Sequence, residues 1–259
     1  MTSTVSEKRV IISPDAAHLA AMVSKKFLNR VVRRIEGDRL AHIVLTGGSM
    51  GGAVLAAAAN NPLSQQIDWS KVHFWWGDER FVSSTDADRN DVQARAAFLD
   101  AIDIPASNIH AVASTDSGED IDAAAAAYAE ELAQFATAEH AWPAFDICFL
   151  GVGPDAHIAS LFPDRAEIQV TDRATVAVRD SPKPPPNRVS LTRPVINSAK
   201  RVWLVMSGPD KAAALGLALA GASYESVPAA GAKGRRRTAF FVDEAAASQV
   251  PPELIDGEY

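Results

Sequence analysis

The segment Gly151–His157 reads Gly-Val-Gly-Pro-Asp-Ala-His and ends on a residue type that moves protons near neutral pH. It follows the apolar run Asp146–Leu150, whose composition predicts a strand in the centre of a sheet. A histidine on a glycine-bearing loop at the carboxyl end of a strand can take a proton from water and return it to a leaving oxygen. We therefore predict that His157 is a catalytic residue.

A glycine-rich segment, Thr46–Gly52, follows a second predicted strand, His42–Leu45. Glycine lets the backbone turn sharply and approach a ligand closely, and the N–H groups that open a following helix can hold a phosphate. We therefore predict an anion-binding loop in which Gly47, Gly48 and Ser49 contact the ligand. A glycine turn that serves only close packing is the alternative.

Gly77–Arg80 places two carboxylates and an arginine directly after a third predicted strand, Val72–Trp76. A surface ion-pair loop would explain these charges, but their place at the end of an apolar strand favours the orientation of a polar ligand. Asp78 and Arg80 are therefore further candidates for the site.

The segment Ser181–Arg188 is rich in proline and carries two cations. Proline restricts the backbone, so Lys183 and Arg188 would be held in fixed positions, as a phosphate clamp requires. A linker or a proline-rich docking segment is the alternative. A second basic run, Arg235–Arg237, is interpreted as a solvated charge run before the last strand.

Two of these segments also match other motifs. Gly47, Ser49 and Gly51 fit the Gly-x-Ser-x-Gly pattern of serine esterases, but little chain precedes the serine to build the usual sheet, and no oxyanion segment of the His-Gly-Gly-Gly type is present. The segment before His157 fits the Gly-x-Gly-x-x-Ala dinucleotide pattern. Pro163, however, leaves only about a turn and a half for the helix that should follow.

The candidates must be positioned by an alternating order of strands and helices. Hydrophobic patterning predicts strands at Val10–Ser13, His42–Leu45, Val72–Trp76, Ile109–Val112, Asp146–Leu150, Thr175–Val178, Val189–Leu191, Arg201–Met206 and Ala239–Val242. It predicts helices from Pro14-Asp15 to about Val32 and over Gly52–Asn60, Asn90–Ile102, Glu119–Glu139 and Asp210–Ala220. Such alternation indicates an α/β protein with a mostly parallel sheet and helices on both faces. Ligands bind beyond the carboxyl ends of such strands, so the three polar segments should share one edge of the sheet.

Composition excludes several classes of protein. The chain has 259 residues, is 47% hydrophobic and carries a net charge of −7, which argues against a nonspecific nucleic-acid binder. Its single cysteine, Cys148, lies in an apolar run and is interpreted as a core thiol, and the other histidines lack metal-ligand spacing. Met1–Glu7 lacks the layout of a signal peptide, and the longest apolar stretch, Ala212–Ala222, is too short to span a bilayer. We expect a cytoplasmic protein without membrane partner, metal or cofactor.

With these segments in place, the sequence resembles the 6-phosphogluconolactonase family. The resemblance is carried by Leu45–Ser49, Trp76–Val82, Gly151–Pro163 and Pro182–Ser190, in the order typical of the family. It implies hydrolysis of 6-phospho-D-glucono-1,5-lactone to 6-phosphogluconate in the oxidative pentose phosphate pathway. It also implies an open, mostly parallel, Rossmann-like sheet like that of glucosamine-6-phosphate isomerases. We expect one domain over residues 1–259 with a small lobe in its second half, as a monomer or weak homodimer.

The resemblance also implies roles for the candidate residues. His157 would act as the general base on water, and Arg80 with Asp78 would orient the substrate. The phosphate would be contacted by Gly48, Ser49, Lys183 and Arg188. A δ-lactone is already activated, so neither a covalent nucleophile nor a metal is required.

The sequence departs from the pattern of the family at three places. Ala156 replaces a common glycine, Met50-Gly51 replaces the usual Thr/Ser-Pro, and Arg89 stands where serine is frequent before Asn90. Two alternative functions remain. Glucosamine-6-phosphate isomerase/deaminases share the fold, but they typically have a Phe-Asn-Glu-Pro-like stretch where this chain has Ser-Leu-Phe-Pro. A noncatalytic sugar-phosphate sensor would carry a helix-turn-helix module, and only about nine residues precede the first predicted strand.

Overall fold

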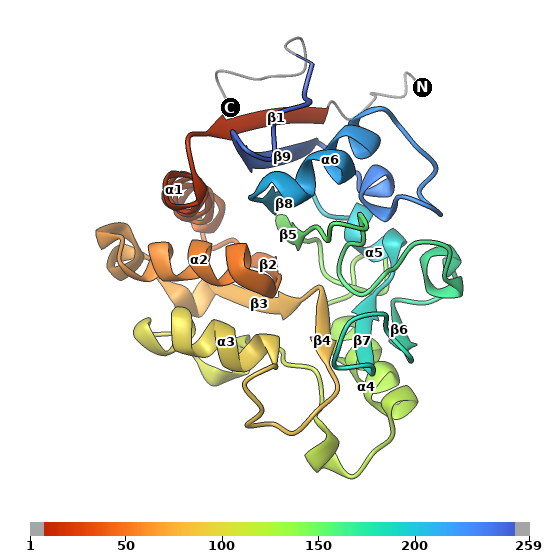
Figure 1. Ribbon diagram of the computed structural model, residues 1–259. Helices are drawn as coiled ribbons and strands as arrows, with labels where there is room; N and C mark the ends of the chain where they lie inside the picture. The colour runs from red at the N-terminus through yellow and green to blue at the C-terminus, as the bar shows by residue number, and fades with distance from the viewer. Residues whose placement is uncertain (1–7, 252–259) are drawn as a thin grey trace.

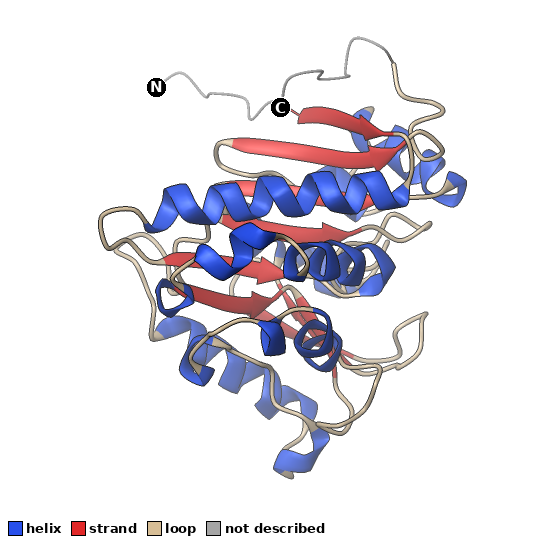
Figure 2. Cartoon of the chain, turned by 90° about the vertical axis from the view of Figure 1, so that its left-hand side faces the viewer, coloured by secondary structure: helices blue, strands red, loops and turns tan. Residues whose placement is uncertain are grey.

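The main element of the fold is a six-stranded sheet in which every pairing is parallel (Figures 1 and 2). The computed structural model describes residues 8–251, so the segment Met1–Glu7, on which the absence of a signal peptide was judged, lies outside the described residues. The strand order is β1-β9-β8-β5-β2-β3. The strands are β1 (Lys8–Ser13), β2 (Ala41–Leu45), β3 (Val72–Trp76), β5 (Ile147–Gly151), β8 (Arg201–Met206) and β9 (Arg237–Asp243). The prediction of an open, mostly parallel α/β sheet is confirmed.

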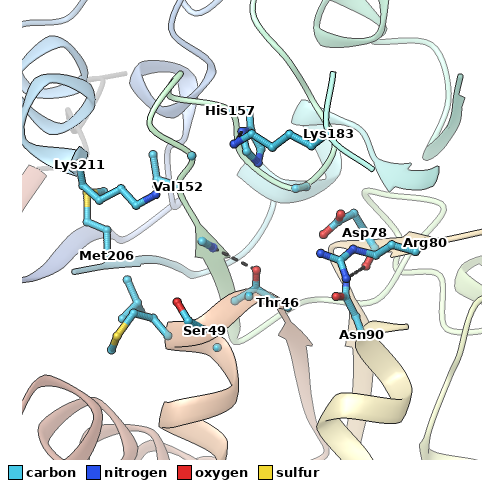
Figure 3. Close-up of a pocket in the computed structure, with 18 of the residues that line it drawn as sticks. Thr46, Ser49, Asp78, Arg80, Asn90, Val152, His157, Lys183, Met206 and Lys211 are labelled. Carbon is cyan, nitrogen blue, oxygen red and sulfur yellow. Dashed lines mark hydrogen bonds between the residues drawn. The ribbon is translucent and has the colours of Figure 1, made fainter. Parts of the chain in front are cut away.

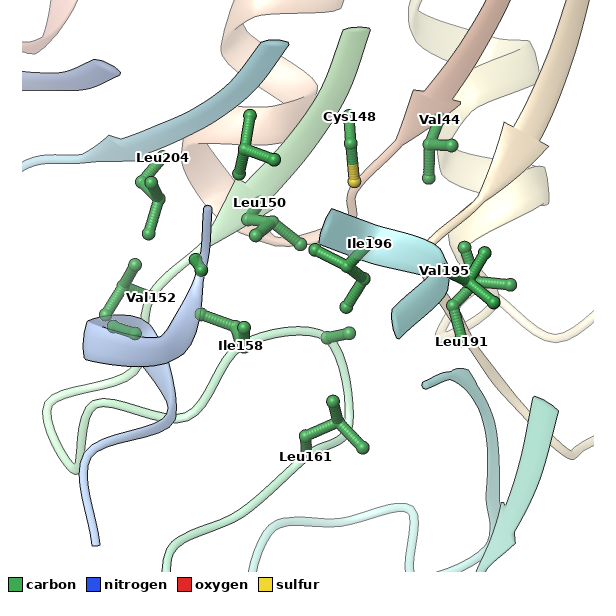
Figure 4. Close-up of a cluster of buried hydrophobic side chains, with 14 of the residues drawn as sticks. Val44, Cys148, Leu150, Val152, Ile158, Leu161, Leu191, Val195, Ile196 and Leu204 are labelled. Carbon is green, nitrogen blue, oxygen red and sulfur yellow. The ribbon is translucent and has the colours of Figure 1, made fainter. Parts of the chain in front are cut away.

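Helices cover both faces of this sheet, as predicted. One face packs against α1 (Ala16–Ile35), α2 (Gly48–Ala59) and α3 (Asn90–Ala97), and the other against α4 (Ile121–Ala133), α5 (Arg193–Asn197) and α6 (Ala212–Leu219). Side chains alternate between the two faces along β5. Ile147 and Phe149 pack into the hydrophobic cluster under α1 and α2, whereas Cys148 and Leu150 pack into the cluster on the side of α4, α5 and α6 (Figure 4). Cys148 is fully buried, and burial raises the pKa of its thiol, so it is a core residue. No helix in residues 8–251 is long and apolar enough to cross a membrane.

A second, antiparallel sheet in the order β4-β7-β6 lies beside the carboxyl end of β3 (Figure 1). Its strands are β4 (Asp78–Arg80), β7 (Arg188–Leu191) and β6 (Thr175–Val178). Most of this sheet comes from the second half of the chain, where a small lobe was expected, but β4 comes from the first half. The charged segment after Trp76 was expected as a loop; it is a strand because it pairs with β7.

The predicted strand Ile109–Val112 is wrong. Only Ile109 forms an isolated parallel bridge, with Phe74, and the N–H of His110 donates to the Phe74 carbonyl at 2.9 Å. The chain then leaves the sheet, and the carbonyl of Val112 accepts a hydrogen bond from the guanidinium of the buried Arg89 at 2.7 Å. A side chain from another element therefore takes the place of a strand partner.

Three helix boundaries differ from the prediction by four residues or more, and one of them is the end of α3, which stops at Ala97 and not at Ile102. Helix α2 begins at Gly48, not at Gly52, and Gly48 itself adopts a φ of +81°, a left-handed conformation that glycine accepts without strain. The first turn of α2 therefore belongs to the glycine-rich segment itself. Helix α4 ends at Ala133, six residues before Glu139, and Phe135 then packs against the rings of β2 and β3.

Three buried histidines form a stacked layer between the main sheet and the end of α4. The rings of His42 and His73 stack at 4.9 Å between centroids, and those of His73 and His110 at 5.2 Å. His73 Nδ1 lies 2.9 Å from His110 Nε2, and His110 Nδ1 lies 2.7 Å from Glu131 Oε1. The indole of Trp75 stacks on His110 and donates to His42 Nδ1 at 3.2 Å. The sequence predicted no role for these residues, and the structure gives them one in packing.

This layer should make the fold sensitive to acid. Burial lowers the pKa of His42 to about 3 and that of His73 to about 4, and burial also lowers the pKa of His110 although Glu131 opposes it. An unfolded histidine titrates near pH 6.5, so the unfolded chain binds more protons as the pH falls below that value. The stability that these neutral rings contribute is therefore present above about pH 6.5 and is lost progressively towards pH 4.

The pH dependence can be measured by urea unfolding at pH 7 and pH 5. We expect the free energy of unfolding to be lower at pH 5, and the difference between the two values to be smaller in His42→Phe, which removes one of the titrating rings. The variant will be less stable at both pH values, since Trp75 loses its acceptor. An unchanged difference between the two pH values would contradict the assignment of the acid sensitivity to this layer.

Candidate active site

A cavity of about 270 Å³ lies at the carboxyl ends of the parallel strands (Figure 3). It is lined by the three polar segments that were predicted to meet and by the proline-rich segment. Every residue proposed for the site from the sequence lines this cavity: Gly47, Gly48, Ser49, Asp78, Arg80, His157, Lys183 and Arg188. The predicted convergence of the segments is therefore confirmed, while the role of each residue stays a prediction.

His157 is paired with a carboxylate that the sequence analysis did not single out. His157 Nδ1 lies 2.6 Å from Asp155 Oδ1, and Lys183 Nζ lies 3.5 Å from the same oxygen. Burial raises the pKa of Asp155, but the hydrogen bond with His157 and the positive charge of Lys183 oppose burial, and together the contacts hold this pKa well below its ordinary value. Asp155 is therefore an ionised acceptor that orients the imidazole ring.

The backbone of this loop leaves room for the pair only because residue 153 is glycine. A Cβ at Gly153 would lie 2.1 Å from His157 Nδ1 and 2.2 Å from Asp155 Oδ1, far inside contact distance. Ala156 has a φ of +64°, a conformation that favours glycine, and its methyl group is buried. The alanine that replaces a common glycine thus keeps the glycine conformation, and the burial of its methyl group offsets part of the strain.

Lys183 and Arg188 lie on the same segment but have different surroundings. Lys183 Nζ reaches the cavity 3.4 Å from His157 Nδ1 (Figure 3). The guanidinium of Arg188 is buried and donates to the backbone carbonyls of Lys183 at 3.1 Å, Pro184 at 2.9 Å and Pro185 at 3.0 Å. Arg188 therefore fixes the segment that presents Lys183, and its side chain closes one wall of the cavity.

Asp78 connects the second sheet to the loop of His157. Its Oδ2 accepts a hydrogen bond from Ser160 Oγ at 2.7 Å and lies 3.8 Å from Arg188 Nη1. The carboxylate is buried, so this contact ties β4 firmly to the segment three residues after His157. Asp78 can therefore hold the surrounding segments in place and, because it lines the cavity, can also contact a ligand.

Arg80 and Asn90 are held at the cavity by a buried carboxylate, Glu79. Glu79 Oε1 accepts from the backbone N–H of Asn90 at 2.7 Å and of Arg80 at 2.8 Å, and Oε2 accepts from that of Asp91 at 2.9 Å. Burial raises the pKa of Glu79, whereas the nearby Arg89 and these N–H groups act in the opposite direction. Glu79 thus caps the first turn of α3 from another element.

Two polar atoms in this part of the site have no partner. Arg80 Nε and Asn90 Oδ1 are buried and make no hydrogen bond within the described residues, and both side chains line the cavity. Buried polar groups are nearly always paired, so unpaired atoms on a cavity wall suit a polar ligand. Asn90 was not among the predicted site residues.

The opposite wall of the cavity combines the start of α2 with a lysine. Gly48 and Ser49 lie in the first turn of α2, where backbone N–H groups have no partner within the helix. Lys211, which follows β8, extends its side chain into the cavity from the side of Val152 and Met206 (Figure 3). A helix N-terminus beside a lysine suits an anionic group. The sequence analysis missed Lys211.

The remaining departures from the family pattern are accommodated locally. Met50 lines the cavity next to Ser49 and also packs against the hydrophobic cluster under α2. Arg89 is buried, and its Nε lies 2.8 Å from Asp91 Oδ1, so it braces the segment that precedes Asn90. Within residues 8–251 no group of three or more His, Cys, Asp or Glu side chains is arranged to hold a metal ion.

Comparison with known proteins identifies the family of the chain. The family described as glucosamine-6-phosphate isomerases/6-phosphogluconolactonase matches residues 14–241. A 6-phosphogluconolactonase of Streptomyces coelicolor is 45% identical over 250 residues, which cover 95% of this chain and 96% of the relative. One of Mycobacterium tuberculosis is 46% identical over 242 residues, covering 93% and 97%.

Solved structures show the same architecture. A 6-phosphogluconolactonase of Thermotoga maritima has a TM-score of 0.79 at 25% identity and covers 92% of this chain and 100% of its own. A monomeric glucosamine-6-phosphate deaminase has a TM-score of 0.77 at 18% identity, covering 93% and 99%, a likeness that shows the fold alone.

A parallel sheet with a carboxylate-paired histidine, two lysines and a helix N-terminus around one cavity defines an α/β enzyme of the type that acts on small anionic molecules. The chain belongs to the family of glucosamine-6-phosphate isomerases and 6-phosphogluconolactonases, as the match over residues 14–241 and the 45% identity over 95% of the chain establish.

Proposed function

We propose that the chain hydrolyses 6-phospho-D-glucono-1,5-lactone to 6-phosphogluconate, a step of the oxidative pentose phosphate pathway. The observation that carries this proposal is the pair of His157 and Asp155, 2.6 Å apart, on the wall of a cavity that also receives two lysines. The names of the relatives support the choice of substrate, since those at 45% and 46% identity are 6-phosphogluconolactonases. The enzyme is thus a hydrolase of a carboxylic ester.

His157 acts as the general base on water. Asp155 is ionised and can only accept, so the proton of the neutral imidazole resides on Nδ1, and the Nε2 lone pair is available to water. The 2.6 Å contact with Asp155 decides the tautomer over the 3.4 Å contact of Lys183 with the same nitrogen. The water oxygen bonds to the lactone carbonyl carbon as one of the two water protons passes to Nε2.

The tetrahedral intermediate then opens the ring. The bond between the former carbonyl carbon and the ring oxygen breaks, and the protonated His157 returns its proton to that oxygen. Negative charge develops on the carbonyl oxygen during attack, and a fixed cation beside the base stabilises it. The distance of 3.4 Å between Lys183 Nζ and the ring of His157 favours Lys183 for this role over the phosphate contact expected from the sequence.

The phosphate lies at the first turn of α2. The N–H groups of Gly48 and Ser49 and the ammonium of Lys211 supply donors and positive charge there. Arg188 supports Lys183 through the backbone, while Asp78 and Arg80 orient the hydroxyl groups of the sugar. Binding of the remote phosphate holds the carbonyl carbon against the base.

Lys211→Met should separate phosphate binding from chemistry. Loss of one charge-assisted contact lowers kcat/KM for the phosphorylated lactone about 10- to 100-fold, while hydrolysis of unphosphorylated glucono-1,5-lactone is unchanged. Steady-state kinetics on both lactones measures this, with the surface variant Lys71→Met as the matched control. An equal loss on the two substrates would show that Lys211 does not bind the phosphate.

The reaction itself is tested with freshly prepared 6-phospho-D-glucono-1,5-lactone in an assay coupled to a dehydrogenase of the product, after subtraction of spontaneous hydrolysis. The same preparation is offered glucosamine 6-phosphate, and ammonia release is measured. Lactone turnover without ammonia supports the proposal. Ammonia release identifies a deaminase, and binding of either sugar phosphate without turnover identifies a sensor.

We further propose that residues 1–259 form a single domain and that the enzyme is a monomer or weak homodimer. We propose a cytoplasmic location, with no nucleic-acid or membrane partner. One hydrophobic cluster contains residues from Val10 to Ala246, which supports one domain. Sedimentation at several protein concentrations tests the oligomeric state.

A further inference from the structure

A second polar cavity, of about 180 Å³, lies at the amino ends of the parallel strands. Seven of its eleven lining residues are cationic, and one is acidic: Arg30, Arg33, Arg34, Arg39, Lys200, Arg201 and Arg236 surround Asp146, with Val31, Ile43 and Ile147 beneath them. We call these seven cations the basic pocket. The chain as a whole carries a net charge of −7, so this local excess of positive charge does not follow from composition.

The fold assembles the basic pocket from distant segments. Arg30, Arg33 and Arg34 lie on the last turns of α1, and Arg39 lies in the turn that leads to β2. Lys200 and Arg201, the first residue of β8, contribute from one side, and Arg236 contributes from the turn before β9. The long helix across the near face of the sheet in Figure 2 is α1, and its end lies at the amino ends of the strands.

This pocket is distinct from the active site. It contains Ile147, the first residue of β5, whereas Gly151, the last residue of β5, lines the active-site cavity. Four residues of extended strand separate the two by roughly 13 Å. The two cavities share none of their lining residues.

The one carboxylate of the pocket is already engaged. Asp146 Oδ1 lies 2.8 Å from Arg34 Nε and accepts from Lys200 Nζ at 2.9 Å, and its Oδ2 accepts from the backbone N–H of His42 at 3.2 Å. Arg39 donates to the backbone carbonyls of Glu36 and Arg33, which carry no charge. Two nearby carboxylates point to other cations: Asp38 pairs with Lys71, and Glu139 approaches Arg235.

Seven cations held around one carboxylate, Asp146, repel one another, and a further anion relieves this repulsion. Arginine presents a planar fork of donors that matches the oxygens of a phosphate group. The cavity is smaller than the roughly 300–1,000 Å³ of an ordinary ligand pocket, so it suits a compact anion. We propose that the basic pocket is a second anion site, which takes a phosphate or diphosphate group.

The site is tested by isothermal titration with inorganic diphosphate at low ionic strength, where charges are least screened. The active site is first disabled as an anion site with Lys183→Gln and Lys211→Gln. In this background Arg33→Gln and Arg236→Gln remove two exposed cations of the basic pocket. The matched control removes two exposed cations elsewhere, with Lys25→Gln and Arg173→Gln, and has the same net charge.

We expect the background variant to bind one diphosphate per chain, the basic-pocket variant to bind it at least about tenfold more weakly, and the control to bind it as the background does. In the background variant, addition of diphosphate should also shift the ¹⁵N–¹H signals of arginine Nε groups. This measurement requires no substitution in the basic pocket. Absence of binding in the background, or an equal loss in the control, overturns the proposal. The Arg33→Gln/Arg236→Gln pair alone should leave lactone hydrolysis unchanged.

Discussion

Replacement of His157 by asparagine is expected to lower kcat for lactone hydrolysis by roughly 10²- to 10⁴-fold, the range that general acid–base catalysis contributes. The asparagine amide can still donate to Asp155, so the loop keeps its contact. It cannot take a proton from water or return one to the ring oxygen. KM should change little, because the residues proposed to bind the phosphate are intact.

The matched control for this variant is His18→Asn, at an exposed histidine that also lies against an aspartate, Asp15, at 2.9 Å. Circular dichroism establishes that both variants are folded. If His157→Asn keeps the wild-type kcat, the histidine is not the base, and water must be activated in another way.

Asp155→Asn should have the second largest effect, a fall in kcat on the order of 10²-fold or more with KM little changed. An asparagine side chain can donate its amide hydrogen to Nδ1, which moves the imidazole proton to Nε2 and removes the lone pair that water needs. Asp155→Glu keeps an ionised acceptor and should recover part of the activity. A fall in kcat with an unchanged KM indicates that Asp155 positions His157, whereas a general loss of structure would also weaken substrate binding and raise KM.

Asp180→Asn is the control for Asp155→Asn, because Asp180 is exposed and has a φ of +51°, which asparagine tolerates. Equal activity of Asp155→Asn and the wild type would show that the short contact with His157 is not needed for catalysis. Equal activity of the Asn and Glu variants would point to the geometry of the loop rather than to the charge of the carboxylate.

The sequence predicted the place of the site better than its internal contacts. Strands β2, β3 and β5 were each recognised by an apolar run, and because parallel strands end at one edge, the segments after them had to meet. Glycines and a histidine at these ends then indicated the type of chemistry. The regular alternation of side chains along a buried strand is a local property, so it could be read without knowledge of the neighbours.

Contacts between segments distant in the chain could not be predicted in this way. The pairing of Asp155 with His157 requires a left-handed backbone conformation at Ala156, and an alanine in the sequence does not predict that conformation. Lys211 enters the cavity because β8 lies next to β5, and hydrophobic periodicity does not predict the order of strands in a sheet. The expected strand at Ile109–Val112 fails for a similar reason, since the buried Arg89 takes a carbonyl that a strand would have used.

The basic pocket shows the same limit. Arg235–Arg237 was interpreted as a solvated charge run, and the run by itself does not predict a binding site. Arg236 gains significance only beside the arginines of α1 and Lys200, which the fold brings to the same end of the sheet.

The most direct test of the central claim is the rate at which 6-phospho-D-glucono-1,5-lactone disappears at neutral pH, followed by ³¹P NMR with and without the protein. We predict that the lactone signal converts to that of 6-phosphogluconate faster than in the blank, with an excess rate that is proportional to protein concentration and roughly 10²- to 10⁴-fold lower in His157→Asn. A rate equal to spontaneous hydrolysis, with folded protein at every concentration, would contradict the account.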